Sequence, residues 1–316
     1  MLQSRTWHYI LLIIIAILTF CLSESATVSA KTVVDQVGRN ITVPDHPQRI
    51  ISLAPSITEV VYDLEAEERL VGVTQYSDYP SQARGLPKVG SYVRLDLEKI
   101  VSLKPELCLA IKDGNPKHII DKIVELGIPV YVIDPRNLEQ TMDSISRIGG
   151  LLNAEKVADR LVDDMRKRIV GVQELVRKTP YRPRVFFQID AEPLVSAGSK
   201  TFIHELIELA GGINSAAGED PYPRYSWEDI LILQPDIIFI SSMAGGLDPK
   251  ELLLTWDKWD QLSAVANSRI YVVDADLFDR PTPRLIDGLE IIAEIIHPEV
   301  FKQVDYRRIR ARNVYS

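Results

Sequence analysis

The most constraining feature of this sequence is a segment of eleven residues that occurs twice without a gap. Residues Leu97–Leu107 read LEKIVSLKPEL, and residues Trp227–Ile237, displaced by 130 positions, read WEDILILQPDI. The matching positions are Glu98 with Glu228, Ile100 with Ile230, Leu103 with Leu233 and Pro105 with Pro235. Each copy predicts a short amphipathic helix that ends before a proline, which has no backbone N–H to donate, and then an apolar β-strand. The chain is therefore expected to form two similar α/β lobes with a cleft between them.

A second pair of segments indicates that the duplication spans whole lobes. Val130–Asp134 reads VYVID, and Ile270–Asp274 reads IYVVD. Repeats of this length are not solenoid units, which recur about every 20 to 50 residues. Strands that alternate with helices predict a mainly parallel sheet in each lobe, flanked by helices.

The charge of the chain excludes one large class of partners. Net charge is −8 over 316 residues, and the basic residues cluster only at Arg307–Arg312. Proteins that bind nucleic acid need an extended basic surface for the phosphates. We expect no nucleic-acid partner.

The N-terminus has the layout of a cleavable signal peptide. Arg5 precedes the apolar run Ile10–Phe20, and small and polar residues then lead to Ala30. The apolar run falls short of the roughly 20 residues that span a bilayer, so cleavage after Ala30 is favoured over a retained anchor. Phe20 stands where a lipid-modified cysteine would need a small residue, so lipid anchoring at Cys21 is not expected. The mature protein is predicted to act in the periplasm, with Cys108 as a buried, unreactive thiol.

The predicted secondary structure follows an alternating order. It comprises a β-hairpin within Val33–Val43, strands at Arg49–Leu53, Leu70–Val73, Val130–Ile133 and Arg184–Gln188, and a helix Thr58–Leu64 capped by Ser56. Beyond Asn153, apolar residues recur every three or four positions as far as Val176, which predicts one helix of about 23 residues and roughly 35 Å. The pair Gly149–Gly150 is expected to divide this helix from the segment before it.

The predicted division of the chain follows from these elements. It consists of a signal peptide at 1–30, an N-terminal lobe with a leading β-hairpin at 31–137, a linking helical segment at 138–180, a C-terminal lobe at 181–305 and a basic tail at 306–316.

Motifs for catalysis and metal binding are missing from the sequence. The five histidines, at positions 8, 46, 118, 204 and 297, are scattered, and no spacing resembles a zinc site. Gly198–Thr201 is not a phosphate-binding loop, because its lysine does not follow directly on the glycine and Pro193 stands where another glycine is needed. We predict a protein without enzymatic activity, cofactor or metal site. A cleft hydrolase is the alternative from another class, and it would need a paired acid and base.

Aromatic and polar residues gather in loops after the predicted strands, where α/β folds bind ligands. These segments are Tyr76–Pro80, Gly90–Tyr92, Pro221–Tyr225 and Asp276–Arg284. Rings from both lobes would enclose a large flat or apolar ligand, with Asp276 as an acceptor and Arg280 as a fork of donors at its rim. The alternative for any single ring is that it only fixes its own loop.

Glu98 and Glu228 occupy the same place in the two copies of the repeat. Asp96 and Ser226 are expected to cap the two helices, which places each glutamate in a first turn. The helix dipole favours an acid there for stability alone. A second interpretation is a pair of exposed acids that docks on basic sockets of a two-fold symmetric partner.

Five segments together resemble the class III binding proteins of ABC importers, whose two lobes are joined by one long helix, and in particular the cobalamin-binding members of that class. The segments are Arg49–Glu59, Tyr76–Pro80, Leu97–Pro105, Tyr225–Glu228 and Phe278–Arg284. The resemblance covers nearly all of the mature chain. It implies a monomer that captures cobalamin or a related corrinoid and delivers it to a transmembrane permease dimer driven by a cytoplasmic ATPase.

The resemblance also implies roles for single residues. The implied ligand-facing positions are Tyr76, Tyr92, Ile111, Val195, Tyr222, Asp276, Leu277 and Arg280, and the implied permease-docking positions are Glu98 and Glu228. The cobalamin-binding members have tryptophan where this chain has Tyr92, Ile111, Tyr222 and Leu277, and phenylalanine at Val195. A ferric siderophore or haem therefore stays open as the ligand. The linking helix also predicts small lobe movements rather than wide hinge closure.

Overall fold

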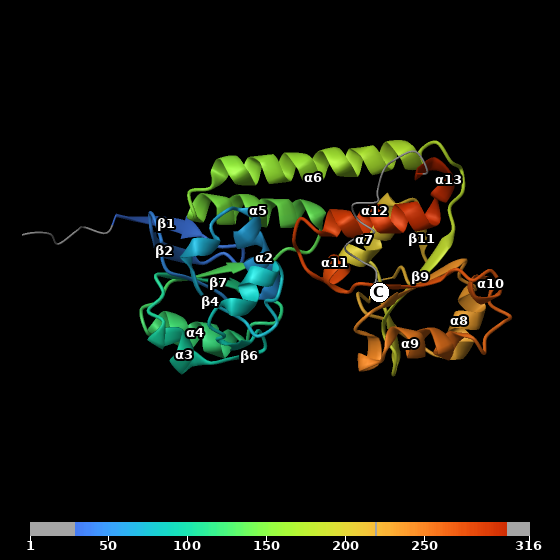
Figure 1. The fold of residues 1–316 in the computed structure, drawn as a ribbon, viewed down its shortest axis with the longest axis horizontal. Coiled ribbons are helices and arrows are strands. Elements are labelled where there is room, and N and C mark those ends of the chain that lie inside the picture. The colour runs from blue at the N-terminus through green and yellow to red at the C-terminus, as the bar shows by residue number, and fades with distance from the viewer. Residues whose placement is uncertain (1–28, 219, 302–316) are drawn as a thin grey trace, which may run out of the picture.

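In the computed structural model, which describes residues 29–218 and 220–301, two α/β lobes lie side by side beneath one long helix, α6 (Glu155–Val176), that runs across both of them (Figure 1). In the N-terminal lobe, four parallel strands stand in the order β4-β3-β7-β8. The elements of this lobe are β1 (Ala30–Val34), β2 (Asn40–Pro44), β3 (Ile50–Ser52), α2 (Pro55–Asp63), β4 (Leu70–Val73), β5 (Gly90–Ser91), β6 (Arg94–Leu95), α3 (Leu97–Ser102), β7 (Leu107–Ile111), α4 (Lys117–Glu125) and β8 (Val130–Ile133), with 3-10 turns at Glu67–Arg69 and Ser81–Gly85.

The C-terminal lobe has a larger, mixed sheet in the order β12-β10-β9-β13-β14, and β11 pairs with β9. Strands β9, β13 and β14 run parallel, whereas β10 is antiparallel to both β9 and β12. Its elements are β9 (Arg184–Asp190), β10 (Leu194–Ser196), α7 (Phe202–Leu209), β11 (Ile213–Asn214), β12 (Arg224–Tyr225), α8 (Trp227–Leu233), β13 (Ile237–Ser241), α9 (Pro249–Trp256), α10 (Ser263–Ala266), β14 (Ile270–Val273), α11 (Asp276–Asp279), α12 (Leu285–Ile296) and α13 (Pro298–Phe301), with a 3-10 turn at Ala244–Gly246.

Helices α5 (Leu138–Leu151) and α6 (Glu155–Val176) link the two lobes. The long helix predicted beyond Asn153 is confirmed, and its 22 residues span about 33 Å. The predicted break at the glycine pair is wrong, because both glycines lie inside α5. A Cβ at Gly149 would stand 2.6 Å from the Cβ of Ala158, so this glycine lets α5 and α6 approach closely instead of ending a helix.

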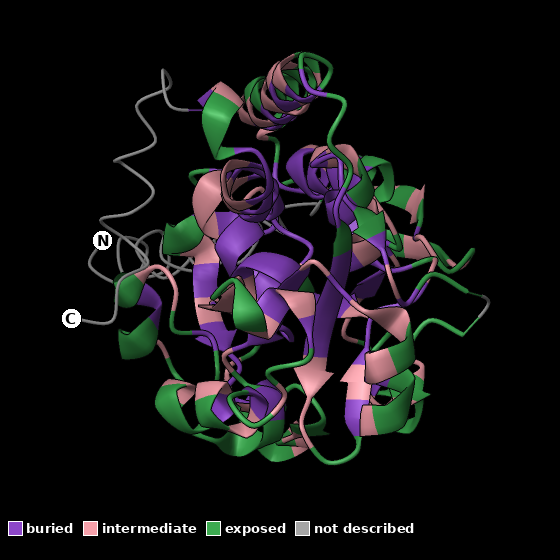
Figure 2. Cartoon of the chain, turned by 90° about the vertical axis from the view of Figure 1, so that its right-hand side faces the viewer, coloured by how far each residue is buried: buried purple, intermediate pink, exposed green. Residues whose placement is uncertain are grey.

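Each central strand contributes to two different cores, which explains why the strands are apolar on both faces. In β7, Leu107 and Leu109 join the large core beneath α5 and α6, and Cys108 and Ala110 join a second core on the opposite face. In β13, alternate residues divide in the same way between the large core and a third core. The large core runs without a break from one lobe into the other, and Figure 2 shows the buried residues in the centre of the molecule.

The first predicted helix begins earlier than expected. Helix α2 starts at Pro55, with Ala54 as its N-cap, and Ser56 makes no capping hydrogen bond. Proline is well suited to the first helical position because it has no N–H to leave unpaired there. Ser56 is therefore a buried residue of the helix rather than its cap.

Several predicted elements outside the site are present in the structure. The parallel sheets, the leading hairpin and the strands Leu70–Val73 and Val130–Ile133 are confirmed. The signal peptide up to position 28, Cys21 included, and the tail 306–316 lie outside the described residues, and the division into five segments stays a prediction. Within 29–218 and 220–301, no helix is both long and apolar enough to cross a membrane.

One half-buried ion pair fixes the long helix to the C-terminal lobe. Arg168 of α6 donates to both carboxylate oxygens of Glu290, at 2.9 and 2.7 Å, and to Asp287 at 2.6 Å, both on α12. The Glu290 side chain is only 9% exposed. Two positions earlier, Arg166 pairs with Glu139 at 2.7 Å, but both side chains are more than half exposed.

Arg168→Ala should lower the free energy of unfolding by about 3 kcal/mol, because Glu290 would stay buried without its partner. The matched control is Arg166→Ala, which breaks an exposed pair on the same helix and should cost less than about 1 kcal/mol. Urea denaturation of both variants measures the difference. Equal losses would contradict the structural role of Arg168.

Candidate ligand-binding cleft

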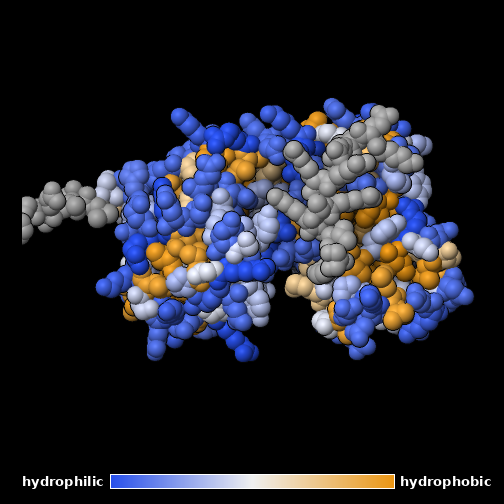
Figure 3. Space-filling model, viewed as in Figure 1, coloured by the Kyte–Doolittle hydropathy of each residue, from blue (hydrophilic) through white to orange (hydrophobic). Residues whose placement is uncertain are grey.

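The molecule is hollowed between the two lobes on the side away from α6 (Figure 3). The loops at this hollow follow the carboxyl ends of parallel strands, which is where α/β sheets bind ligands. Tyr76 follows β4, Ile111 ends β7 and Asp276 follows β14. The structure therefore brings residues far apart in the sequence to one cleft.

The N-terminal wall of the cleft is organised by the buried side chain of Asn115. Its amide donates to the carbonyl oxygens of Leu53 and Tyr92, both at 2.8 Å, and its oxygen accepts from the N–H of Ile111 at 2.8 Å. The ring of Tyr92 lies over Gly114, where a Cβ would come within 2.6 Å of two ring carbons. Two implied ligand positions, Tyr92 and Ile111, are thus held together by one asparagine.

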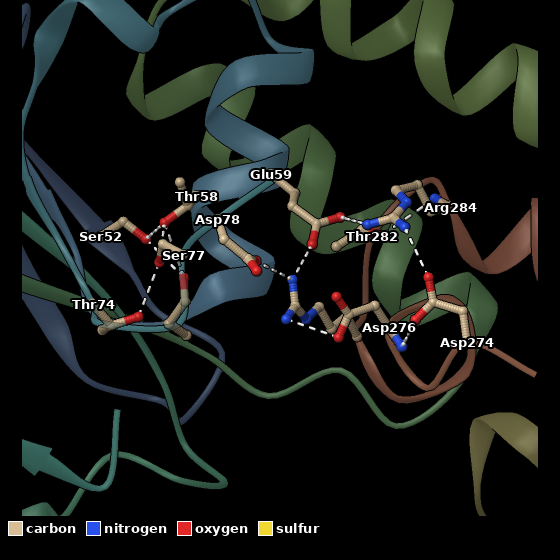
Figure 4. Close-up of polar contacts among 12 residues, drawn as sticks. Ser52, Thr58, Glu59, Thr74, Ser77, Asp78, Asp274, Asp276, Thr282 and Arg284 are labelled. Carbon is tan, nitrogen blue, oxygen red and sulfur yellow. Dashed lines mark hydrogen bonds and ion pairs between the residues drawn. The ribbon is translucent and has the colours of Figure 1, made fainter. Parts of the chain in front are cut away.

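A buried network of hydroxyl groups fixes the loop that carries Tyr76 (Figure 4). The Oγ atom of Ser77 lies 2.9 Å from both Thr58 Oγ1 and Thr74 Oγ1. Lys88 donates to the carbonyl oxygen of Ser77 at 3.0 Å, and partial burial lowers the pKa of its ammonium group. Since the backbone is anchored one residue away, the ring of Tyr76 can stay 55% exposed without the loop being loose.

The C-terminal wall carries Val195, half-buried in β10, and Tyr222, which is 58% exposed. Partial burial raises the pKa of the Tyr222 hydroxyl, and the carboxylates of Asp279 and Asp113 raise this pKa further. Asp113 belongs to the N-terminal lobe and forms an ion pair with Arg136 of the same lobe. Tyr222 therefore faces charges from both lobes.

A carboxylate of the N-terminal lobe binds two arginines of the C-terminal lobe beside the cleft. Glu59 of α2 accepts from Arg280 at 2.7 Å and from Arg284 at 3.1 Å, through its two separate oxygens. Glu59 is 1% exposed, and this burial raises its pKa even though both arginines act to lower it. The contact joins segments 221 positions apart in the sequence and couples the two lobes directly.

Two of the implied ligand positions, Arg280 and Leu277, are largely covered by other groups of the protein. Arg280 is not an open fork of donors, because it pairs with Glu59 and, at 2.8 Å, with Asp276, and its side chain is 16% exposed. Leu277 is 3% exposed and belongs to the large core, because α11 packs on α12 where Gly288 leaves room. The exposed implied positions are Tyr76, Tyr92 and Tyr222.

Glu59, Arg280, Arg284 and Asp276 together form the floor of the cleft, and sequence reasoning missed Glu59, the residue at its centre. Glu59 was part of a matching segment but was given no role. A signal was present: it is the one acid within Ser56–Val61, a stretch of α2 in which every residue is buried. An acid on an apolar helix face needs a buried cationic partner.

The two glutamates of the repeat lie exposed on the first turns of α3 and α8, in the half of the molecule away from α6 (Figure 1). The predicted caps are confirmed: Asp96 accepts from the N–H of Lys99 at 2.9 Å, and Ser226 from that of Asp229 at 3.2 Å. Neither glutamate forms a hydrogen bond or an ion pair with another residue of the described part of the chain. The two helices therefore present the same acid in the same local setting.

A pair of equivalent arginines fixes these two helices to their sheets. Arg49 of the first lobe donates to the carbonyl oxygen of Leu103, and Arg184 of the second donates to that of Leu233 at 3.1 Å. These carbonyls lie at matching positions near the ends of α3 and α8. The duplication thus preserves the support of each glutamate helix as well as the glutamate.

Other chemistry is limited in the described part of the chain. Cys108 is buried, as predicted, and burial raises the pKa of its thiol to about 12, so it is not a nucleophile at neutral pH. Residues 29–218 and 220–301 contain no group of three or more side chains that could hold a metal ion.

The ionisation of Asp276 should make the stability of the fold depend on pH. Burial raises the pKa of Asp276 from 3.8 to about 6, although the positive charge of Arg280 acts to lower it. The charged form of Asp276 therefore destabilises the fold at neutral pH. Asp276→Asn should raise the melting temperature by about 2–4 °C at pH 7.5, and this gain should fade as the pH drops through 6 towards 4. Thermal unfolding at both pH values measures it, with Asp163→Asn on α6 as the control. A gain that persists at pH 4 would contradict this account.

Comparison with known proteins places the chain in a family. The vitamin B12-binding protein of Vibrio cholerae serotype O1 is 35% identical over 252 residues, which are 78% of this chain and 88% of that protein. An uncharacterized ABC transporter substrate-binding lipoprotein of Bacillus subtilis, YvrC, is 33% identical over 278 residues, 86% of this chain and 87% of the relative.

Solved structures show the same fold. The crystal structure of the periplasmic vitamin B12 binding protein BtuF of Vibrio cholerae matches with a TM-score of 0.70 and 32% identity, over 80% of this chain and 97% of that one. The haem-binding protein RhuT of Roseiflexus sp. RS-1, in its apo form, matches with a TM-score of 0.72 and 26% identity, over 80% and 99%. A family model described as "Periplasmic binding protein" matches residues 50–277. The chain belongs to this family of non-enzymatic binding proteins, and it is a substrate-binding protein of ABC transport.

Proposed function

We propose that this protein captures cobalamin or a related corrinoid in the cleft between its lobes and delivers it to the permease of an ABC importer. The observation that carries the proposal is the pair of exposed rings on opposite walls, Tyr76 at 55% and Tyr222 at 58% exposure. Exposed aromatic rings on both sides of a cleft suit a large ligand with a flat macrocycle. Tyr92, 37% exposed, extends the N-terminal wall.

The relatives support a corrinoid and also define the rival ligand. The Vibrio cholerae protein that shares 35% identity is named for vitamin B12, whereas RhuT, with 26% identity, is named for haem. Haem and a corrinoid are both macrocycles, so aromatic walls alone do not separate them. A ferric siderophore is the third candidate of the same kind.

The site of action follows from the proposed targeting. Cleavage of the signal peptide after Ala30 releases a monomer into the periplasm. The Bacillus subtilis relative is named a lipoprotein. In this chain Phe20 precedes Cys21, which argues against the same anchoring.

Small lobe movements accompany ligand capture in this proposal. The large core is continuous across both lobes, and Glu59 bonds to two arginines of the other lobe. A wide hinge rotation would have to open that core and leave a buried carboxylate without partners. The lobes are therefore expected to adjust around the ligand rather than close over it.

The ligand is tested by titration of the mature protein with cyanocobalamin, haem and a ferric siderophore, followed by calorimetry. Cyanocobalamin should bind most tightly. Tyr76→Ala and Tyr222→Ala should each weaken it about tenfold, or roughly 1.4 kcal/mol, because each removes a ring from the cleft wall. Tyr76→Phe and Tyr222→Phe keep the rings and serve as matched controls.

Two results would overturn the proposed ligand. One is the absence of binding by any corrinoid. The other is tighter binding of haem or siderophore, which would move the protein to another ligand class within the same family. Turnover of any substrate would favour the hydrolase alternative instead.

Docking on the permease is assigned in this proposal to Glu98 and Glu228. Both are exposed on equivalent helices, one in each lobe, as a two-fold symmetric partner with basic sockets would require. The helix dipole favours an acid in the first turn of either helix. The support for docking is that the same exposed acid occurs at the same place in both lobes. The C-terminal glutamate also has Ile232, 81% exposed, one helical turn away.

The double variant Glu98→Ala/Glu228→Ala should leave cyanocobalamin affinity unchanged and reduce uptake into cells about tenfold or more, because the docking charges are lost. Uptake of labelled cyanocobalamin by cells that depend on this protein measures the effect. The control is Glu155→Ala/Glu174→Ala, which removes two exposed acids from α6 on the opposite side of the molecule. A fall in affinity, or equal uptake by both variants, would contradict the docking role.

A further inference from the structure

The arginines at the cleft floor are already bound by carboxylates of the protein. Arg280 pairs with Glu59 at 2.7 Å and with Asp276 at 2.8 Å. Arg284 pairs with Glu59 at 3.1 Å, and Asp274 lies 3.9 Å from its second terminal nitrogen. Each guanidinium therefore has more than one internal anion within reach before any ligand arrives.

The aspartates of this cluster are more exposed to solvent than its arginines. The arginine side chains are 16% and 14% exposed, for Arg280 and Arg284 respectively. Asp276 is 25% exposed, and Asp78, 3.7 Å from Arg280, is 51% exposed. The charge that a ligand meets at the floor is therefore negative.

An aromatic ring further restricts access to one arginine. The guanidinium of Arg284 lies 3.9 Å from the centre of the Tyr79 ring, which covers one of its planar faces. One terminal nitrogen of the same guanidinium donates to Glu59, which is almost fully buried. A ligand carboxylate that approaches Arg284 therefore meets a guanidinium that Glu59 already binds and Tyr79 partly covers.

Negative charge also reaches the aromatic wall. The hydroxyl of Tyr222 lies within the electrostatic influence of Asp279 in its own lobe and of Asp113 in the other, and both raise its pKa. Arg136 acts in the opposite direction but is itself paired with Asp113. Negative charge therefore predominates both at the cleft floor and at the C-terminal wall.

We infer that Asp276 is a specificity-determining residue, which makes the cleft accept macrocycles with carboxamide side chains and reject those with free carboxylates. The inference rests on the proposed function, because it concerns the ligand of the same cleft. Asp276 acts in two ways: it occupies the donors of Arg280 that a ligand carboxylate would need, and it repels the incoming charge. A carboxamide N–H, in contrast, can donate to the exposed oxygens of Asp276 or Asp78.

The test compares cyanocobalamin with its monocarboxylate derivatives, in which one peripheral propionamide is hydrolysed to a propionate. The two ligands share the macrocycle and differ by one charge. The full mature protein at pH 7.5 and low salt should bind the carboxylate about tenfold more weakly, since like charges in a partly screened cleft repel. Raising the ionic strength should reduce this ratio.

Asp276→Asn should reduce the ratio to below about threefold, because Arg280 regains free donors and the repelling charge is gone. Asp78→Asn, a change at a largely exposed side chain, is the second variant and should reduce the ratio partly. Asp163→Asn on α6 should keep the ratio of the unchanged protein. Thermal unfolding of each variant shows whether it is folded.

The outcomes separate this inference from the proposed function. Equal affinity of the unchanged protein for both corrinoids, or a full ratio retained in Asp276→Asn whatever the result for Asp78→Asn, would overturn the inference while cyanocobalamin binding stands. Absence of cyanocobalamin binding would overturn the proposed function and the inference with it. Tight binding of haem, which carries two propionates, would overturn both as well.

Discussion

The contact on which the arrangement of the lobes depends is the buried carboxylate of Glu59 between two arginines of the opposite lobe. An isolated charge in this position would be strongly unfavourable, and its stability requires both guanidinium groups to stay in place. The same contact sets the relative position of α2 and the segment after α11, and therefore the width of the cleft floor. Together with the core shared by both lobes, it holds the two walls of the cleft in a fixed relative position.

Duplication explains more of the structure than the shared fold alone. Lys104 and Gln234, equivalent positions at the ends of α3 and α8, both have left-handed backbone conformations, with φ of 47° and 45°. Each directly precedes the proline of its repeat, so the tight exit from the helix is retained with two different residues. Arg49 and Arg184 then bind the ends of these helices in the same manner. The two helices are therefore equivalent in their ends and in their attachment to the sheets, as well as in their place in the fold.

Local patterns predicted the strands and the long helix, because periodicity and proline positions act within a few residues. The structure of the cleft floor could not be predicted in this way. The partners of Glu59 lie 221 and 225 positions away, and no local signal specifies which buried cation meets a buried acid. Arg280 was predicted to face the ligand for a related reason: a motif identifies a residue at the cleft but does not show that protein carboxylates already occupy its donors. Gly149 misled the helix prediction because close packing against Ala158, a tertiary effect, overrode helix propensity.

The two lobes diverge where the ligand would bind, and this divergence has a structural origin. The C-terminal sheet contains β10, β11 and β12, which are absent from the four-stranded sheet of the other lobe, and β12 directly follows the segment with Tyr222. The N-terminal wall instead depends on Asn115 and on hydroxyl groups beneath Tyr76. The two walls are therefore built from unrelated parts, whereas the glutamate helices keep the same local structure in both lobes. Divergence at the cleft and equivalence at the glutamate helices thus coexist in one molecule.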